Sequence, residues 1–330
     1  TQPRKAQEPI TYGEAQALPY QDKLALLHRI TIKSGSHVAP APDEPLEECS
    51  LCVQEWYAFL AGIEHTDTPE HAPDADVSPL IARIARRLND ALHDDELRTR
   101  LLVPLLPLQK GTAGSRQLEE RRGWRALDWL VRENLPAWCD LVPALSEAGQ
   151  ALRALGPVTD RTSLKEALKQ TRVARETAWP LRRASLKRVR SAVAVAVAAA
   201  AADAVAVAVA VAVADAVAAA AADAVAVAVA AAAADAVADA AAVADAVAAA
   251  VADAVADAVA AAVAVADAVA DADAAADAAA AAVAGGTWEQ RYRAAYAAAR
   301  KALAPITAPR HEAAAALVRE LCAMRDEAVA

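Results

Sequence analysis

The chain has 330 residues, a formal charge of −9, 56% hydrophobic residues and only 4% aromatic residues. The acidity lies in one segment: residues 192–284 hold twelve Asp and no Lys or Arg, which leaves 34 basic against 31 acidic residues elsewhere. The net negative charge is therefore confined to the tract, which excludes a function that depends on uniform negative charge over the whole molecule. Asp also interrupts every apolar stretch of the tract before it reaches the roughly 20 residues of a membrane span, so no membrane partner is expected.

The N-terminal sequence and the cysteine content favour a cytoplasmic protein. The first residues, TQPRKAQEPITYGEAQ, lack the apolar core of a secretion signal. The four Cys residues do not form the dense framework of a small secreted domain. We therefore expect a reducing compartment.

Residues 1–190 are predicted to form a helical N-terminal domain. Pro and Gly residues indicate that 1–19 and 33–45 are loose. A short helix is predicted at 21–32, and a second one from Pro45 to about Gly62. A polar loop at 64–77 follows.

Clear start signals mark the later helices of this domain. Ser78-Pro79 combines a capping residue with a proline at the first helical position. The helix with the clearest apolar face is predicted at about 117–134, with a break near Pro136. Ser163 and Glu166 form a capping-box pattern that opens a further helix.

Residues 192–284 consist only of Ala, Val and Asp, with every Val and Asp at an odd position. A period of two is typical of a strand, but the tract has no turn residues between strands. Ala is the best helix former, so we predict that 191–284 is helical and keep a sheet as the alternative. Slippage in GC-rich DNA would leave the same pattern, in which case the tract is a neutral expansion.

The C-terminal region, 285–330, is predicted to be a helical hairpin around Pro305 and Pro309. The expected fold class is therefore all-α, with a helical N-terminal domain, a helical Ala/Val/Asp tract and this hairpin.

One set of residues has the spacing of a metal site. Cys49, Cys52, His65 and His71 match the Cys₂His₂ ligand pattern of a structural zinc. Against this interpretation, Cys49 and Cys52 lie on a predicted helix, whereas zinc fingers place their Cys pair on a hairpin. The alternative is two half-buried Cys residues on an apolar face and two His residues in a loop. No other cofactor is expected.

The segment 161–190 carries ten Lys or Arg residues against two Glu. Such a patch can bind phosphates, but the acidic tract follows it directly, so we expect it to face that tract or solvent. The sequence has no Ser elbow and no HExxH, and GTAG at 111–114 lacks the Lys of a phosphate loop. We therefore expect no enzyme activity.

Four blocks carry a resemblance to a known group of proteins: HTDTP (65–69), VSPLIARIARRLND (77–90), GTAG (111–114) and WRALDWLVRENLPAW (124–138). They resemble uncharacterised actinobacterial proteins with a Trp-rich helical N-terminal region and a long Ala-rich repeat tract. That family has no established activity to transfer. Some Ala-rich helical proteins of this kind are similar to proteins proposed as immunity proteins of bacterial toxin systems.

The preferred hypothesis is a non-enzymatic, helical protein-interaction protein, with an immunity-like role as one form of it. Its partner would be a protein, and the sequence does not indicate an oligomeric state. The alternative is a zinc-stabilised regulatory protein that touches nucleic acid weakly through 161–190.

Overall fold

The protein is predominantly helical. Its helical content is 66%, with 2% strand and no sheet, among the residues that the structure describes, so the all-α prediction is confirmed there. The expected tract helix, 191–284, lies outside the described residues. No helix in the described part is both long and apolar enough to cross a membrane. A computed structural model describes residues 9–35, 38–92, 94–140, 143–160, 162–174, 176–177 and 288–326.

The chain divides into two compact units. Unit 1 comprises Thr1–Arg122 together with Ala314–Ala330, and unit 2 comprises Gly123–Ala313. Both ends of the chain therefore belong to the same unit. The predicted organisation into 1–190, 191–284 and 285–330 stays a prediction.

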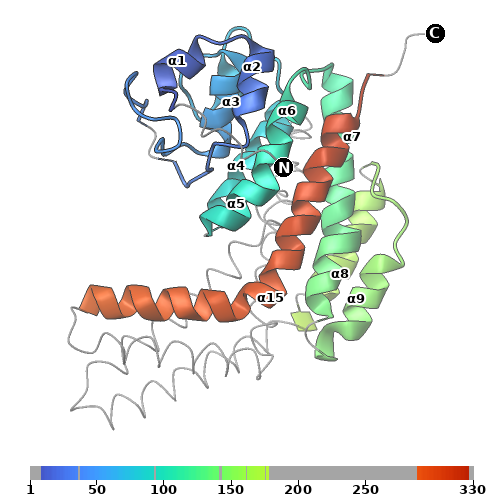
Figure 1. Ribbon diagram of the computed structural model, residues 1–330. Coiled ribbons are helices and arrows are strands. Elements are labelled where there is room, and N and C mark those ends of the chain that lie inside the picture. Colours follow the sequence, from blue (N-terminus) through green and yellow to red (C-terminus); the bar gives the residue numbers. More distant parts are fainter. Residues whose placement is uncertain are drawn as a thin grey trace, which may run out of the picture. The chain divides into compact units, whose positions relative to one another are not determined.

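Unit 1 begins with two short helices, α1 (Tyr12–Gln16) and α2 (Tyr20–Leu26) (Figure 1). Thr11 opens α1 through a capping box, in which the side chains of Thr11 and Glu14 accept hydrogen bonds from each other's backbone N–H. The predicted helix at 21–32 is shorter than expected, because α2 ends at Leu26 and Ile32 forms a parallel bridge with Leu51.

Helix α3 (Val53–Ala61) begins later than predicted. Pro45 forms an antiparallel bridge with Thr11, so the backbone of 45–51 bonds to other segments rather than to a helix. Cys52 is the N-cap, and the side chain of Glu55 accepts its backbone N–H at 2.6 Å. The predicted end is confirmed, since Gly62 has φ +75, a left-handed conformation that glycine adopts without strain.

Helix α4 (Pro79–Ala91) begins as predicted, with Ser78 capping the N–H of Ile81. It leads to α5 (Asp95–Leu102), the 3₁₀ turn η2 (Val103–Leu105) and α6 (Leu106–Gln109). Large side chains from α3 and α4 form the centre of unit 1. Fully buried members include Trp56, Tyr57, Phe59, Leu60, Leu80, Ile81, Ile84 and Leu88.

Helix α7 (Arg116–Trp129) continues through a π-helical turn, η3 (Leu130–Asn134), into α8 (Leu135–Cys139). The proline within α8, Pro136, has no N–H and cannot complete a regular α-helical ladder. Instead, one turn of the helix contains an extra residue. The N–H of Leu135 bonds to the carbonyl of Leu130, five residues earlier, which is the bond of a π-helix. The break predicted near Pro136 is therefore a local π turn.

Unit 2 also contains the 3₁₀ turn η4 (Pro143–Leu145), α9 (Ser146–Arg153) and a helix at 162–174. The cap of that last helix differs from the prediction. Asp160 accepts the N–H of Ser163 at 2.7 Å, and the Ser163 hydroxyl accepts the N–H of Asp160 at 3.1 Å. Asp160 is the capping residue because its carboxylate reaches the first N–H groups of the helix.

The C-terminal region is one helix, α15 (Trp288–Ala323), instead of the predicted hairpin. Pro305 and Pro309 both lie inside it and both are exposed. Each removes one backbone hydrogen bond from the helix.

Candidate functional site

A cavity of about 550 Å³ opens in unit 1 where α3 meets the loop that follows it. Several residues along its lining are exposed, among them Gly62, Glu64, His71 and Asp74, so it is open to the surface. The lining residues are Ala61, Gly62, Ile63, Glu64, His65, Thr66, Thr68, His71, Ala72, Pro73, Asp74, Asp76 and Lys110.

The turn at the end of α3 directs the chain into this lining. The N–H of Gly62 bonds to the carbonyl of Phe59 at 3.3 Å, and that of Ile63 bonds to Ala58 at 3.0 Å. Both bonds supply a donor to a carbonyl in the last turn of the helix. The loop from Glu64 onward therefore starts from a fixed position.

Arg86 of α4 holds the middle of the loop. Its guanidinium donates to the carbonyl of Asp67 at 2.5 Å and to the carboxylate of Glu70 at 2.9 Å. The Glu70 side chain is fully buried, and its second carboxylate oxygen has no hydrogen-bond partner among the described residues. Glu70 thus depends on Arg86 for compensation of its charge.

A polar chain made by three side chains forms one wall. The buried Tyr57 hydroxyl donates to Asp76, and Lys110 donates to the other oxygen of Asp76 at 2.7 Å. Partial burial opposes ionisation of Asp76, but the bonds from Lys110 and Tyr57 outweigh it and lower the pKa of that carboxyl. Burial and the hydrogen bond to Asp76 raise the pKa of Tyr57.

His65 stands between the cavity and a buried carboxylate. Its Nε2 lies 3.5 Å from Oε1 of Glu55, whose side chain is fully buried in α3. The Nδ1 atom of His65 is buried and has no hydrogen-bond partner in the part of the chain that the structure describes. The position of this imidazole is therefore set by Glu55 on one side.

The predicted zinc ligands fall into two places. His65 and His71 both line the cavity, whereas Cys49 and Cys52 are buried and do not belong to its lining. The described residues contain no group of three or more His, Cys, Asp or Glu side chains placed to hold a metal ion. The structure does not bring the four residues together, and zinc binding stays a prediction.

Burial governs the chemistry of the two thiols. It raises the pKa of the Cys49 thiol to about 11 and that of Cys52 to about 12. Both side chains are therefore neutral thiols at neutral pH, the form that is a weak nucleophile and a weak metal ligand.

The groups that the cavity offers to a ligand are mainly acidic. Lys110 is the one Lys or Arg among the lining residues, and it is already paired with Asp76. Glu64, His71 and Asp74 have no side-chain hydrogen bond or ion pair to the described residues. The arrangement can therefore bind a cation or a hydrogen-bond donor.

No protein-family model, no curated protein and no solved structure matches the chain. The resemblance to actinobacterial Ala-rich proteins therefore stays a prediction.

The sequence analysis singles out the two histidines but not the other polar lining residues Asp76 and Lys110. Asp76 and Lys110 are 34 positions apart in the sequence and meet only in the fold. The available signal was the density of polar residues in 64–77, which marked a loop but not a cavity.

The predicted basic segment is only partly described. Within 162–174, one face packs inward through Leu164, Ala167 and Thr171. On the exposed face, Lys169 donates to Glu166 at 2.8 Å, which neutralises part of the positive charge. The remainder of 161–190, from residue 178 onward, lies outside the described residues.

Proposed function

We propose that this protein is a non-enzymatic binding protein whose cavity receives a positively charged side chain, arginine or lysine, from a partner protein. The observation that carries the proposal is the charge balance of the lining. The carboxylates of Glu64 and Asp74 are exposed and have no side-chain partner among the described residues, whereas the Lys110 ammonium is held by Asp76. The cavity therefore attracts cations.

The size and position of the cavity fit a single side chain better than a large ligand buried on all sides. Its volume of about 550 Å³ lies in the usual range for binding pockets. Its exposed rim allows the backbone of a partner to remain outside while one side chain enters. A guanidinium is favoured over an ammonium because its planar fork can form two parallel hydrogen bonds to one carboxylate.

The contacts within the lining support binding rather than catalysis. Both oxygens of Asp76 are engaged, by Tyr57 and Lys110, so this carboxylate is not available as a general base. The buried thiols of Cys49 and Cys52 are neutral at neutral pH and do not line the cavity.

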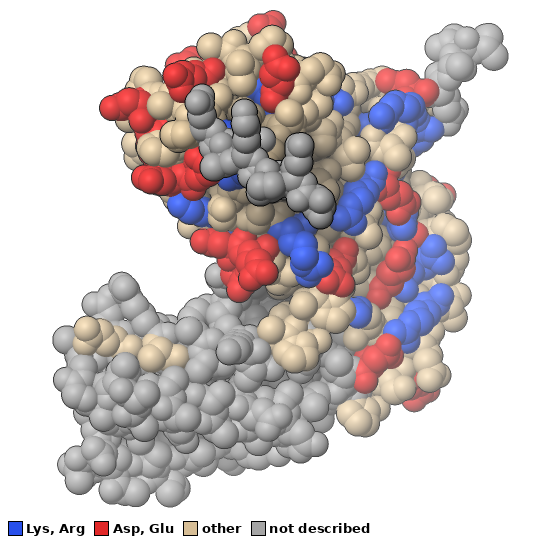
Figure 2. Space-filling model, viewed as in Figure 1, with Lys and Arg blue, Asp and Glu red and all other residues tan. Residues whose placement is uncertain are grey.

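Two further observations support a protein as the partner. The face shown in Figure 2 has Lys and Arg interspersed with Asp and Glu over its described part, without a continuous basic area for nucleic acid. The sequence resemblance to Ala-rich proteins similar to immunity proteins is compatible with a toxin as the partner. An immunity-like role is thus one form of this proposal.

The proposal is tested by fluorescence anisotropy of the full chain with a labelled decapeptide of alternating Arg and Gly. Glu64→Gln combined with Asp74→Asn removes the two available carboxylates. We expect the peptide to bind the unaltered protein, and the double variant to weaken binding at least tenfold.

The matched control is Asp43→Asn combined with Glu48→Gln, which changes the net charge equally at exposed sites outside the lining. It should stay within twofold of the unaltered protein. Equal weakening by both double variants would show attraction by overall charge and would refute a cavity site.

A further inference from the structure

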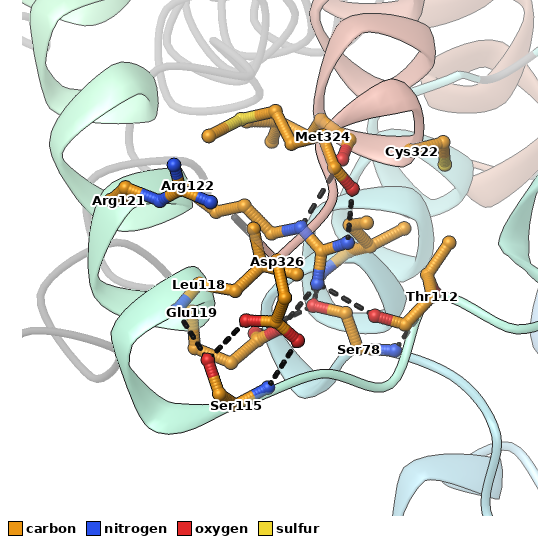
Figure 3. Close-up of polar contacts among 12 residues, drawn as sticks. Ser78, Thr112, Ser115, Leu118, Glu119, Arg121, Arg122, Cys322, Met324 and Asp326 are labelled. Atoms are coloured by element: carbon orange, nitrogen blue, oxygen red, sulfur yellow. Dashed lines mark hydrogen bonds and ion pairs between the residues drawn. The ribbon is translucent and has the colours of Figure 1, made fainter. Parts of the chain in front are cut away.

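A second polar site joins the two ends of the chain within unit 1. The guanidinium of Arg122 on α7 is fully buried. It donates to the carbonyl of Leu321 at 3.2 Å and to that of Met324 at 3.1 Å, at the C-terminal end of α15. Figure 3 shows Arg122 extending from its helix toward Met324.

The remaining donors of Arg122 fix its orientation. One terminal nitrogen bonds to the carbonyl of Thr112 at 2.6 Å and to the carboxylate of Glu119 at 2.5 Å. Glu119 also accepts the hydroxyl of Ser78 at 2.6 Å. Thr112 and Glu119 therefore hold the guanidinium where it can reach the C-terminal end of α15.

The chemistry of this contact is specific for a helix C-terminus. The last four carbonyls of an α-helix lack intrahelical partners and carry partial negative charge. Arg122 supplies donors and positive charge to two carbonyls in this region, and Arg121 donates to the carbonyl of Arg325 at 2.5 Å. Because these bonds go to main-chain carbonyls, they depend on the presence of a helix C-terminus and not on the identity of its side chains.

A side chain beyond the helix adds a second point of recognition. The carboxylate of Asp326 accepts the N–H of Ser115 at 3.1 Å and also the Ser115 hydroxyl. That hydroxyl caps α7 by accepting the N–H of Leu118 at 3.1 Å. Asp326 thus lies at the N-terminus of α7, where negative charge is favoured.

We infer that the surface formed by Thr112, Ser115, Glu119 and Arg122 is a binding site for the C-terminal end of an α-helix, with residues 314–326 as a ligand that a separate chain can also supply. The ligand class is a helix whose final turn is followed within three residues by a carboxylate. Its apolar side would match that of α15, where Ala314, Leu317, Val318 and Leu321 are buried.

The two partners of this contact are far apart in the sequence. Unit 2, Gly123–Ala313, separates the two parts of unit 1 in the sequence. The two parts therefore meet through contacts made in the fold, such as the bonds from Arg122 to Leu321 and Met324.

The test uses the full chain with a protease recognition sequence in place of Gly285-Gly286, cleaved after folding. We expect the fragment that begins at 287 to co-elute with the rest of the chain in gel filtration. A fluorescent copy of the fragment, followed by anisotropy, should exchange into the complex. Separation of the pieces on cleavage would overturn the inference.

Arg122 is buried, so its replacement would disturb folding, and the exposed pair Ser115 and Asp326 provides the sharper variants. Asp326→Ala in the fragment should raise the exchange rate about tenfold, and adding Ser115→Ala should raise it little further because both act through one contact. Asp43→Ala, an exposed carboxylate elsewhere in unit 1, is the control and should leave the rate unchanged. Equal rates for Asp326→Ala and Asp43→Ala would contradict the inference.

Discussion

Arg86 and Glu70 form the ion pair on which the shape of the cavity loop depends. Replacing Arg86 with Met keeps the aliphatic stem but leaves the fully buried Glu70 carboxylate without its charged partner. Because removal of one partner leaves a buried charge uncompensated, we expect the free energy of unfolding to fall by about 3 kcal/mol. Urea unfolding followed by circular dichroism measures this change.

The double variant Arg86→Met with Glu70→Gln provides the control for that prediction. With the carboxylate neutralised, a large part of the lost stability should return. If the double variant is as unstable as Arg86→Met alone, the pair does not carry the energy assigned to it.

The buried thiols predict how stability depends on pH. Burial raises the pKa of Cys49 and Cys139 to about 11 and that of Cys52 and Cys322 to about 12, from the ordinary 9.0. The folded protein therefore binds these protons more tightly than the unfolded chain. This contribution is fully present below about pH 9 and is lost as the pH rises toward 12.

Urea midpoints under reducing conditions at pH 8 and pH 10.5 test this dependence. We expect a lower midpoint at pH 10.5. Replacing Cys139 with Ala should reduce the difference between the two pH values, and an unchanged or larger difference would count against the thiols as its source.

The residues of the candidate site could be predicted only where a sequence pattern marks them. His65 and His71 were found through ligand spacing and do share one cavity. Asp76 and Lys110 also line it, and Tyr57 bonds to Asp76; these contacts join distant segments, which no local pattern encodes. Cys52 was placed within a helix, but the bridges at Pro45 and Leu51 delay the helix and make this residue its cap.

At the scale of elements, the packing of α8 against α9 leads to a prediction at Gly149. A Cβ added at Gly149 would lie 2.9 Å from the Cβ of Cys139 and 3.3 Å from the carbonyl of Pro136. Gly149→Ala should therefore destabilise the protein by about 1–3 kcal/mol through overpacking, although Ala favours helix. Thermal unfolding followed by calorimetry measures the effect.

Gly156→Ala is the matched control, because a Cβ there would meet no atom within 4 Å. It should be neutral or slightly stabilising. If both variants lost similar stability, the close approach of α8 and α9 would not explain why position 149 is a glycine.

Prolines show where element boundaries resist prediction from sequence. Pro79 begins α4 as expected, yet Pro136 produces a π turn and Pro305 and Pro309 lie inside one long helix. At Pro79 the missing N–H would be unpaired anyway, whereas Pro136, Pro305 and Pro309 each remove a hydrogen bond from within a helix. Whether the helix then ends, widens or continues depends on its surroundings, and these are contacts that the local sequence does not contain.

At the scale of the whole molecule, the all-α class could be predicted because helical periodicity, caps and alanine content agree along the chain. The division into units could not. Unit 1 combines both chain ends because the buried Arg122 binds carbonyls of the last helix, about 200 residues away. Main-chain carbonyls carry no sequence signal, so this long-range contact is visible only in the fold.

The most direct measurement of the central proposal is the NMR titration of the histidine side chains in the full chain with the Arg/Gly decapeptide. Single His→Gln variants assign the imidazole signals. If the cavity receives a cationic side chain, the signals of His65 and His71 shift with a shared saturation curve, while that of His28, which lies outside the lining, stays unchanged. A peptide that binds but leaves both cavity histidines unshifted would contradict the account.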